Sequence, residues 1–174
     1  IHQKINLIFY FNLIIMATFT NKTFKDDDDY FTPKYVWEDI KDYIPKDKVI
    51  WEAFYGDGKS GSFLEELGFN VIHKEVDFFE NDLGEIVVSN PPFSKIKQIL
   101  EKLKELQKPF ILIMPSSKIN TQYFRKNFKD DIQIIIPKKR IAFIKNKKQT
   151  KSCNFDCFYY CYKMNLTKDI IWLN

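Results

Sequence analysis

The residues best suited to chemistry on an amino group lie at 89–93, which read Ser-Asn-Pro-Pro-Phe. The two prolines fix φ and lack N–H donors, so this turn is stiff and its carbonyls are free to accept. The Asn90 carboxamide and the Pro91 carbonyl can both accept hydrogen bonds from an –NH2 group, which would orient the nitrogen lone pair toward an electrophile. Phe93 offers a flat face on which a planar base can stack. The plainer alternative is a rigid connection between a strand and a helix.

A second loop, residues 52–58, reads Glu-Ala-Phe-Tyr-Gly-Asp-Gly after a short apolar strand and before a helix. Glycines in such a loop allow the backbone to turn sharply and to approach a ligand closely. Residues 53–60 also differ by one residue from the phosphate-binding pattern G-x-x-x-x-G-K-S/T. A P-loop NTPase would need a later strand that ends in a carboxylate for magnesium. The strand expected at 86–88 is followed by Ser89 and Asn90 instead, so the NTPase interpretation has one motif without its partner.

The elements that must position these two loops alternate between strand and helix. Thr32 and Pro33 begin a helix that runs toward Tyr43. The apolar patterns and their glycine and proline boundaries predict strands at 49–52, 70–73, 85–89, 110–114, 132–136, 140–144 and 155–163, and further helices at 62–67, 94–106 and 121–128. The fold class is therefore α/β, with a mostly parallel central sheet that is covered on both faces. Three consecutive strands at the end of the chain predict an antiparallel C-terminal edge.

Three segments in this order resemble a known family: Tyr-Phe-Thr-Pro at 30–33, the loop at 52–58 and the turn at 89–93. The chain resembles the S-adenosylmethionine-dependent amino-methyltransferases of the N-P-P-F type. That family includes adenine-N6 methyltransferases of phage, viral and restriction-modification type. The resemblance covers residues 30–163, of which the N-P-P-F motif is the most specific part. It implies a Rossmann-like methyltransferase fold and S-adenosylmethionine as the cofactor.

The resemblance also implies roles for individual residues. The methionine part of the cofactor would be bordered by Phe31, Thr32, Pro33, Glu52, Phe54, Gly56 and Gly58. Glu75 would accept from the ribose hydroxyls, and Asp77 and Phe78 would flank the adenine. Relatives have a helix between these two acids, which here are two residues apart, so either acid could bind the ribose. The target base would be held by Asn90, Pro91, Pro92 and Phe93.

The function implied is transfer of a methyl group to N6 of adenine in nucleic acid, with DNA slightly favoured over RNA. In a duplex the target base would have to be flipped out. The alternatives are transfer to cytosine N4 or to glutamine N5 of a protein, the P-loop NTPase, and a non-catalytic methyltransferase-like binding subunit. After the core strands few residues remain for a target-recognition domain, so sequence selectivity is low or a partner protein supplies it.

The charge pattern is consistent with a nucleic-acid partner. The net charge is only +4, but residues 138–151 contain seven basic residues and no acidic ones. They are Lys138, Lys139, Arg140, Lys145, Lys147, Lys148 and Lys151. A solvated loop is the alternative; beside a base-modifying site we expect a phosphate-binding surface.

The cysteines and the N-terminus bear on location. Cys153, Cys157 and Cys161 share one face of an expected strand, so three reduced thiols in the core are favoured over a metal site. Reduced cysteines indicate an intracellular location, cytoplasmic or nuclear. Residues 5–15 are nearly all apolar, but the run is shorter than the ~20 residues that span a bilayer. We expect no membrane association, a disordered extension at 1–29, a natural start at Met16, and one catalytic domain at 30–174.

Overall fold

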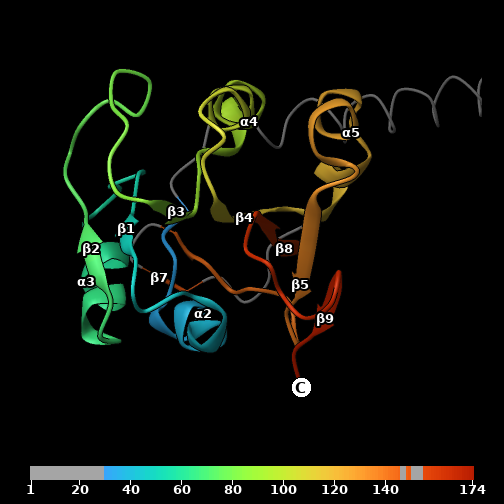
Figure 1. The fold of residues 1–174 in the computed structure, drawn as a ribbon. Coiled ribbons are helices and arrows are strands. Elements are labelled where there is room, and N and C mark those ends of the chain that lie inside the picture. Colours follow the sequence, from blue (N-terminus) through green and yellow to red (C-terminus); the bar gives the residue numbers. More distant parts are fainter. Residues whose placement is uncertain (1–29, 146–147, 150–154) are drawn as a thin grey trace, which may run out of the picture.

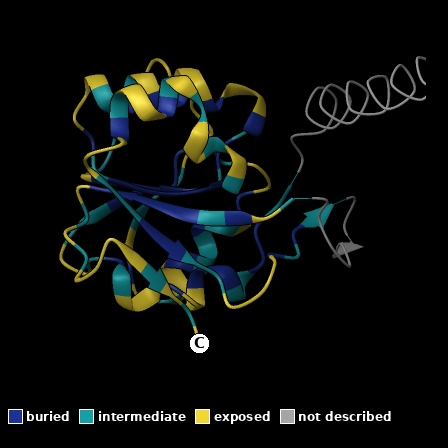
Figure 2. Cartoon of the chain, turned by 90° about the vertical axis from the view of Figure 1, so that its right-hand side faces the viewer, coloured by how far each residue is buried: buried dark blue, intermediate teal, exposed yellow. Residues whose placement is uncertain are grey.

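The computed structural model describes residues 30–145, 148–149 and 155–174. The N-terminal extension expected at 1–29, which contains the expected natural start at Met16, lies outside these ranges. The described part has three layers, with α4 and α5 on one side of a central sheet and α2 and α3 on the other (Figure 1). The strands are largely buried between helices whose outer faces are exposed (Figure 2).

The helical segments are short. They are α2 (Lys34–Glu38), η1 (Lys41–Tyr43), α3 (Lys59–Glu66), η2 (Phe93–Lys95), α4 (Ile96–Glu105), η3 (Ser116–Asn120) and α5 (Gln122–Phe128). The helix expected to run from Thr32 to Tyr43 is therefore two pieces, α2 and η1, which are separated at Asp39 and Ile40.

Seven strands form the main sheet. They are β1 (Val49–Trp51), β2 (Asn70–Ile72), β3 (Ile86–Ser89), β4 (Phe110–Pro115), β5 (Ile132–Ile136), β8 (Cys157–Tyr162) and β9 (Ile170–Trp172). Their order is β2-β1-β3-β4-β8-β5-β9. A separate hairpin pairs β6 (Ile144–Lys145) with β7 (Lys148–Gln149), so of the strand expected at 140–144 only the last residue, Ile144, is in a strand.

The pairing confirms a mostly parallel sheet. β8 is antiparallel to both of its neighbours, β4 and β5, and the other six strands run in one direction. The expectation of an antiparallel edge is wrong, because β8 lies inside the sheet and the edge strand is β9, which is parallel to β5. The burial of β8 agrees with this position: five of its six residues are buried, as expected for a strand covered on both faces. β9 has only three residues and was not expected.

Two consecutive residues of β8 connect the sheet to both helical layers. The Tyr159 hydroxyl donates to the carbonyl of Val36 in α2 at 2.8 Å. Tyr160 points to the other side, where its ring packs edge-on against Phe124 of α5 and its hydroxyl donates to the Pro115 carbonyl at 3.0 Å. Buried tyrosines need such partners for their hydroxyl groups. The Tyr159 hydrogen bond therefore fixes α2 on the sheet, and the ring contact between Tyr160 and Phe124 fixes α5 on the opposite face.

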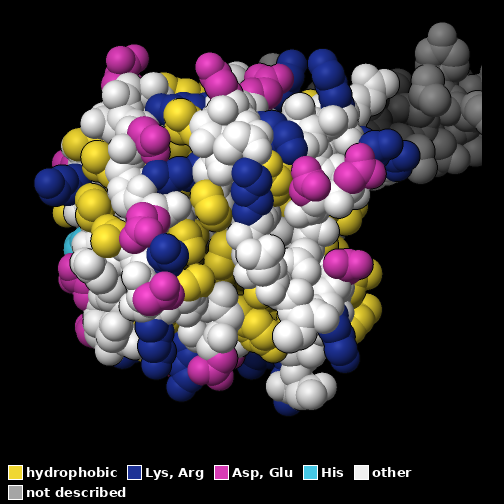
Figure 3. Space-filling view, in the orientation of Figure 1, with side chains coloured by type: hydrophobic (Ala, Val, Ile, Leu, Met, Phe, Trp, Pro, Cys, Tyr) yellow, Lys and Arg dark blue, Asp and Glu magenta, His cyan; other side chains and the backbone are white. Residues whose placement is uncertain are grey.

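The surface is mixed in charge. On the face shown in Figure 3, basic and acidic side chains are interspersed, without a large area of one sign. Within the described ranges, no helix is both long and apolar enough to cross a membrane.

Candidate functional site

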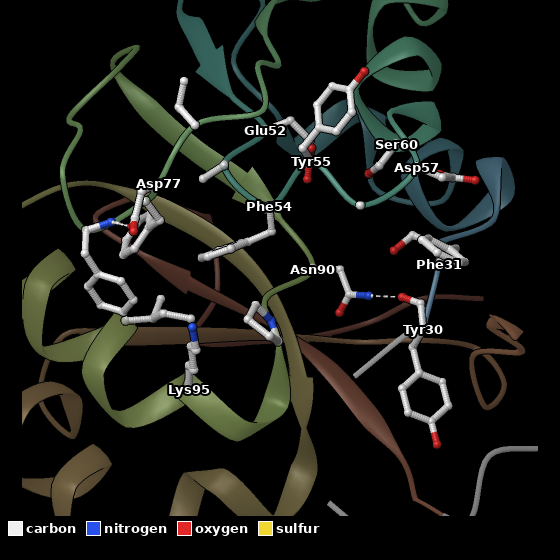
Figure 4. Close-up of a pocket in the computed structure, with 18 residues that line it drawn as sticks. Tyr30, Phe31, Glu52, Phe54, Tyr55, Asp57, Ser60, Asp77, Asn90 and Lys95 are labelled. Atoms are coloured by element: carbon white, nitrogen blue, oxygen red, sulfur yellow. Dashed lines mark hydrogen bonds between the residues drawn. The ribbon is translucent and has the colours of Figure 1, made fainter. Parts of the chain in front are cut away.

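The two loops singled out in the sequence follow neighbouring parallel strands. Residues 52–58 follow β1, and Asn90 follows β3, which pairs with β1 in parallel. The carboxyl ends of both strands therefore meet at one edge of the sheet, where open α/β sheets bind ligands. A cavity of about 430 Å³ lies there (Figure 4). Its lining residues are Tyr30, Phe31, Thr32, Glu52, Ala53, Phe54, Tyr55, Gly56, Asp57, Ser60, Val76, Asp77, Phe78, Phe79, Asn90, Pro92, Lys95 and Ile99.

The glycine loop has the conformation that its sequence suggests. Gly56 and Gly58 have φ of +56° and +76°, the left-handed region that side chains with a Cβ rarely adopt. A Cβ on Gly56 would lie 3.4 Å from the Phe31 ring, and one on Gly58 would lie 2.9 Å from the Tyr55 hydroxyl. Gly56 therefore allows the loop to pass close to Phe31, and Gly58 allows it to turn back on Tyr55, as the ligand-binding interpretation requires.

Glu52 is a buried carboxyl in the cavity wall, with only 1% of its surface exposed. The Ser89 hydroxyl donates to its Oε1, while its Oε2 has no hydrogen-bond partner among the described residues. Burial raises the pKa of Glu52 from 4.5 to about 8, against the opposing effect of hydrogen bonds from Ser89 and the Phe54 backbone. Glu52 is thus a carboxyl with one free oxygen, and a cationic ligand would favour its ionised form.

Asn90 has one half of its amide bound and the other half free. Its Nδ2 donates to the Tyr30 carbonyl at 2.8 Å, and its Oδ1 is buried without a partner among the described residues. A carbonyl oxygen can only accept, so the amide nitrogen must face Tyr30 and the amide oxygen must face away from it. Figure 4 shows this arrangement, in which the oxygen is directed away from Tyr30 at the cavity wall.

The loop between β2 and β3 forms the opposite wall. Asp77 and Phe78 line the cavity, whereas Glu75 is exposed and does not. Of the two acids left open as ribose ligands, the structure brings Asp77 to the cavity. The Asp77 Oδ1 accepts from the Phe79 backbone N–H at 2.7 Å, and the Phe78 ring stacks on Trp51 with centroids 5.4 Å apart.

The structure brings together nine of the expected cofactor and target-base residues as cavity lining. They are Phe31, Thr32, Glu52, Phe54, Gly56, Asp77, Phe78, Asn90 and Pro92. The expected residues that do not line it are Pro33, Gly58, Glu75, Pro91 and Phe93. Pro33 is the N-cap residue of α2 and Gly58 is the N-cap residue of α3. Both are adjacent in sequence to lining residues but do not line the cavity themselves.

Phe93 differs most from its expected position. Its ring is only 4% exposed and packs against Tyr30 and Phe155, with centroids 6.0 Å and 5.5 Å apart. Phe143 contacts the same ring. The flat face expected to receive a base is therefore buried in an aromatic cluster in this structure.

Several lining residues carried no assigned role in the sequence. Tyr30 contributes the carbonyl that holds Asn90, and the Ser60 hydroxyl accepts from the Trp37 indole N–H at 3.0 Å. Asp57 lies between the two left-handed glycines, a position from which the sequence could have suggested it. Lys95 and Ile99 belong to η2 and α4, whose orientation over the cavity depends on packing that no local pattern reveals.

The basic segment begins at the same edge of the sheet, directly after β5. Lys138, Lys139 and Arg140 are exposed, and Arg140 pairs with Asp156 at 2.7 Å. Ile144 forms two backbone hydrogen bonds of 2.9 Å with Phe31, and the Lys145 ammonium lies 5.1 Å from the centroid of the Tyr30 ring. Lys147 and Lys151 lie outside the described residues, and Lys148 is described only as part of β7. The segment thus borders the cavity through Phe31 and Tyr30.

The chain matches no protein-family model, and it matches no curated protein in sequence. Within the described residues no group of three or more His, Cys, Asp or Glu side chains could hold a metal ion. Cys157 and Cys161 are buried thiols of β8 that form no disulfide with each other, and burial raises the pKa of the Cys161 thiol. Cys153 lies outside the described residues. The geometry of the cavity is therefore the basis for assigning a function.

Proposed function

We propose that the chain transfers a methyl group from S-adenosylmethionine to the exocyclic N6 amine of adenine in nucleic acid, with DNA slightly favoured over RNA. The observation that carries this proposal is a pair of buried oxygens, Glu52 Oε2 and Asn90 Oδ1, without a hydrogen-bond partner among the described residues. Buried polar atoms are nearly always paired, so unpaired ones in a cavity indicate groups that a ligand satisfies. Both residues line the same cavity, which suits one cationic ligand and one amine donor.

The residues present fit the cofactor. Three carboxyl groups, those of Glu52, Asp57 and Asp77, line the cavity, and among the described lining residues only Lys95 is basic. Such a wall favours a ligand with an ammonium and a sulfonium group, and Asp77 is placed to accept from ribose hydroxyls. When bound, the cofactor would supply an electrophilic methyl group on its sulfonium.

The chain itself would contribute mainly orientation. The Tyr30 carbonyl fixes the Asn90 amide, so that Asn90 Oδ1 can accept from the target amine and direct the nitrogen lone pair. Pro92 forms part of the same wall and keeps the turn stiff. Fixed acceptors of this kind stabilise the charge that develops on the amine during transfer, without reorganisation in the reaction step.

Two further features support a nucleic-acid methyltransferase. A sheet of six parallel strands with one antiparallel strand inside it is compatible with the fold that the family resemblance implies. Exposed Lys138 and Lys139 follow β5 at the cavity edge, where they could bind phosphates.

The NTPase interpretation receives less support. Lys59, which would bind the phosphates of a nucleotide, is 68% exposed, pairs with Asp57 at 3.1 Å and does not line the cavity. The carboxylates of Asp57 and Asp77 in the cavity lining would repel a triphosphate, and Glu52 would add to this repulsion when ionised.

Incubation of the protein with methyl-labelled cofactor and separate pools of DNA, RNA and protein tests the proposal. We expect label on adenine N6 of a nucleic acid. Label on cytosine or on protein glutamine would mean that the target is that group and not adenine N6. Cofactor binding without transfer to any pool would indicate a non-catalytic binding subunit. Magnesium-ATP binding that Lys59→Ala abolishes, together with no binding of the methyl donor, would overturn the methyltransferase altogether.

A further inference from the structure

Lys102 on α4 has its ammonium surrounded by three backbone carbonyls. Its Nζ donates to the carbonyls of Phe78 at 2.6 Å, Phe79 at 2.9 Å and Asn81 at 2.7 Å. A lysine ammonium has three donors, so all of them are used on one short stretch of chain. The same Nζ lies 5.0 Å from the centroid of the Phe78 ring, within the range of a cation–π contact.

That stretch is the cavity wall that faces Glu52 and Asn90. Asp77, Phe78 and Phe79 line the cavity, in a loop between β2 and β3 that contains no helix or strand (Figure 1). Within the loop, the Asn81 side chain donates to the Asp77 carbonyl at 2.8 Å. The negative ends of the three carbonyl dipoles repel one another, and the positive charge of Lys102 between them offsets this repulsion, so Lys102 stabilises this loop conformation.

A second lysine fixes the other end of the loop. The Lys108 ammonium pairs with Asp82 at 2.7 Å and donates to the Gly84 carbonyl. Neither of these residues lines the cavity. The two lysines therefore hold one loop at different places, and only the Lys102 contacts reach the residues of the cavity wall.

Lys102 also connects this wall to the turn that carries Asn90. α4 follows η2, which begins at Phe93 directly after that turn, and Ile99 of α4 lines the cavity. From these contacts we infer that Lys102 is a positioning residue: it holds the wall formed by Asp77, Phe78 and Phe79 and so sets the affinity for the adenosyl part of the ligand. The identity of that ligand rests on the proposed function.

The test compares Lys102→Met with Lys97→Met, a matched control on the same helix whose lysine is exposed and lies 3.9 Å from Glu101. S-adenosylhomocysteine is titrated by calorimetry, and methyl transfer is measured at saturating cofactor. We expect Lys102→Met to weaken binding by about tenfold or more while kcat changes less than about threefold. Lys97→Met should match the wild type, and Lys102→Arg, which keeps a cationic donor, should recover most of the affinity.

Hydrogen exchange of the ligand-free protein gives an independent result. The backbone amides of residues 77–82 should exchange faster in Lys102→Met than in the wild type or in Lys97→Met. If Lys102→Met only lowers the melting temperature and binds S-adenosylhomocysteine like the wild type, Lys102 supports the fold and the inference is wrong. If the wild type itself does not bind this ligand, the proposed function fails, and the inference fails with it.

Discussion

At the scale of single residues, the cavity is defined by polar atoms that the fold leaves unsatisfied. Four buried side-chain atoms of the described residues have no hydrogen-bond partner: Trp51 Nε1, Glu52 Oε2, His73 Nδ1 and Asn90 Oδ1. Leaving such an atom unpaired costs about 1–3 kcal/mol of folding free energy, and folding alone does not explain why the protein retains this cost. Two of the four, Glu52 Oε2 and Asn90 Oδ1, belong to residues that line the cavity, so the cost is offset when a ligand that forms hydrogen bonds with them binds.

The first prediction concerns Asn90→Ala. This substitution removes the acceptor that would orient the target amine, so kcat for methyl transfer should fall by about a hundredfold or more. Cofactor affinity should change little, because the contact is made to the other substrate. Single-turnover kinetics on an adenine-containing oligonucleotide and separate calorimetry of cofactor binding measure the two quantities.

Asn127→Ala is the control for this experiment. Asn127 donates to the Tyr123 carbonyl at 2.9 Å from α5 and does not line the cavity, so the same atoms are removed at a site without a proposed role. If Asn90→Ala instead loses cofactor affinity and transfers methyl normally once saturated, Asn90 contacts the cofactor and its assigned role is wrong.

The second prediction concerns the pH dependence that Glu52 gives to stability. Its pKa is raised from 4.5 to about 8 in the folded protein, so between these values the folded state holds a proton that the unfolded state releases. This contribution is complete below pH 4.5 and is lost as pH rises toward 8. Between pH 6 and pH 8 the loss amounts to about 2 kcal/mol, or a fall in melting temperature of roughly 4–8 °C.

Thermal melting of the ligand-free protein at several pH values measures this effect. Glu52→Gln keeps an oxygen for the Ser89 hydroxyl but does not titrate in this range, so its melting temperature should fall less between pH 6 and pH 8. Parallel curves for the two proteins would mean that Glu52 is already ionised in the ligand-free state.

At the scale of elements, the sequence predicts where the buried strands lie along the chain better than it predicts their order in the sheet. Buried strands such as β3 and β4 are continuous apolar runs, and their positions were expected within about one residue. The sequence also allows the prediction that the loops after β1 and β3 lie close together, because the carboxyl ends of parallel strands meet at one edge of the sheet. The interior position of β8 could not be predicted, because local patterns do not determine which strands pair.

The same limit applies to the site. The motif at 89–93 indicates Asn90 as an acceptor, but only the fold shows that Tyr30, sixty residues earlier, holds its amide. Phe93 was expected to be accessible because of its motif, whereas the rings of Tyr30, Phe143 and Phe155 bury it. Contacts between segments far apart in the chain decide both outcomes.

The third prediction concerns the packing of α3 on the sheet. Gly61 ends the glycine-rich stretch in the sequence, but the structure places it inside α3, where an added Cβ would lie 2.3 Å from the His73 Cγ. Because that atom lies next to Cβ in the histidine side chain, it cannot move away easily. Gly61→Ala should therefore cost about 1–3 kcal/mol of stability, despite the higher helix propensity of alanine.

A double-mutant cycle with His73→Gly tests this cause by thermal melting. His73→Gly removes the imidazole and also the His73 Cβ, which would lie 2.5 Å from the added Cβ, so Gly61→Ala should cost much less in the His73→Gly background than in the wild type. An equal loss of melting temperature in both backgrounds would show that the clash is not the cause.

At the scale of the whole molecule, the connection between β5 and β8 matters most for a large substrate. It leaves the sheet after Ile136 and returns at Cys157, so it begins and ends at the cavity edge. Its contacts with the N-terminal side of the domain include the bonds between Ile144 and Phe31 and one from the Ala142 N–H to the Tyr35 hydroxyl at 2.9 Å. Arg140 pairs with Asp156 within the connection, so Lys138 and Lys139 are its exposed cations that form no ion pair within the described residues.

The last prediction follows from this distribution of charge. Each lysine that neutralises a phosphate contributes about −0.9 to the slope of log affinity against log salt for duplex DNA. Lys138→Gln combined with Lys139→Gln should therefore weaken oligonucleotide binding and flatten that slope by roughly 1–2 units. The matched control is Lys41→Gln with Lys46→Gln, since both of these exposed lysines precede β1 and lie toward the opposite edge of the sheet. The control changes net charge by the same amount, so an equal flattening in both double variants would mean that nucleic acid responds to net charge alone. A slope that changes only in the Lys138 and Lys139 variant would place the phosphates at the edge of the sheet where Asn90 and Glu52 line the cavity.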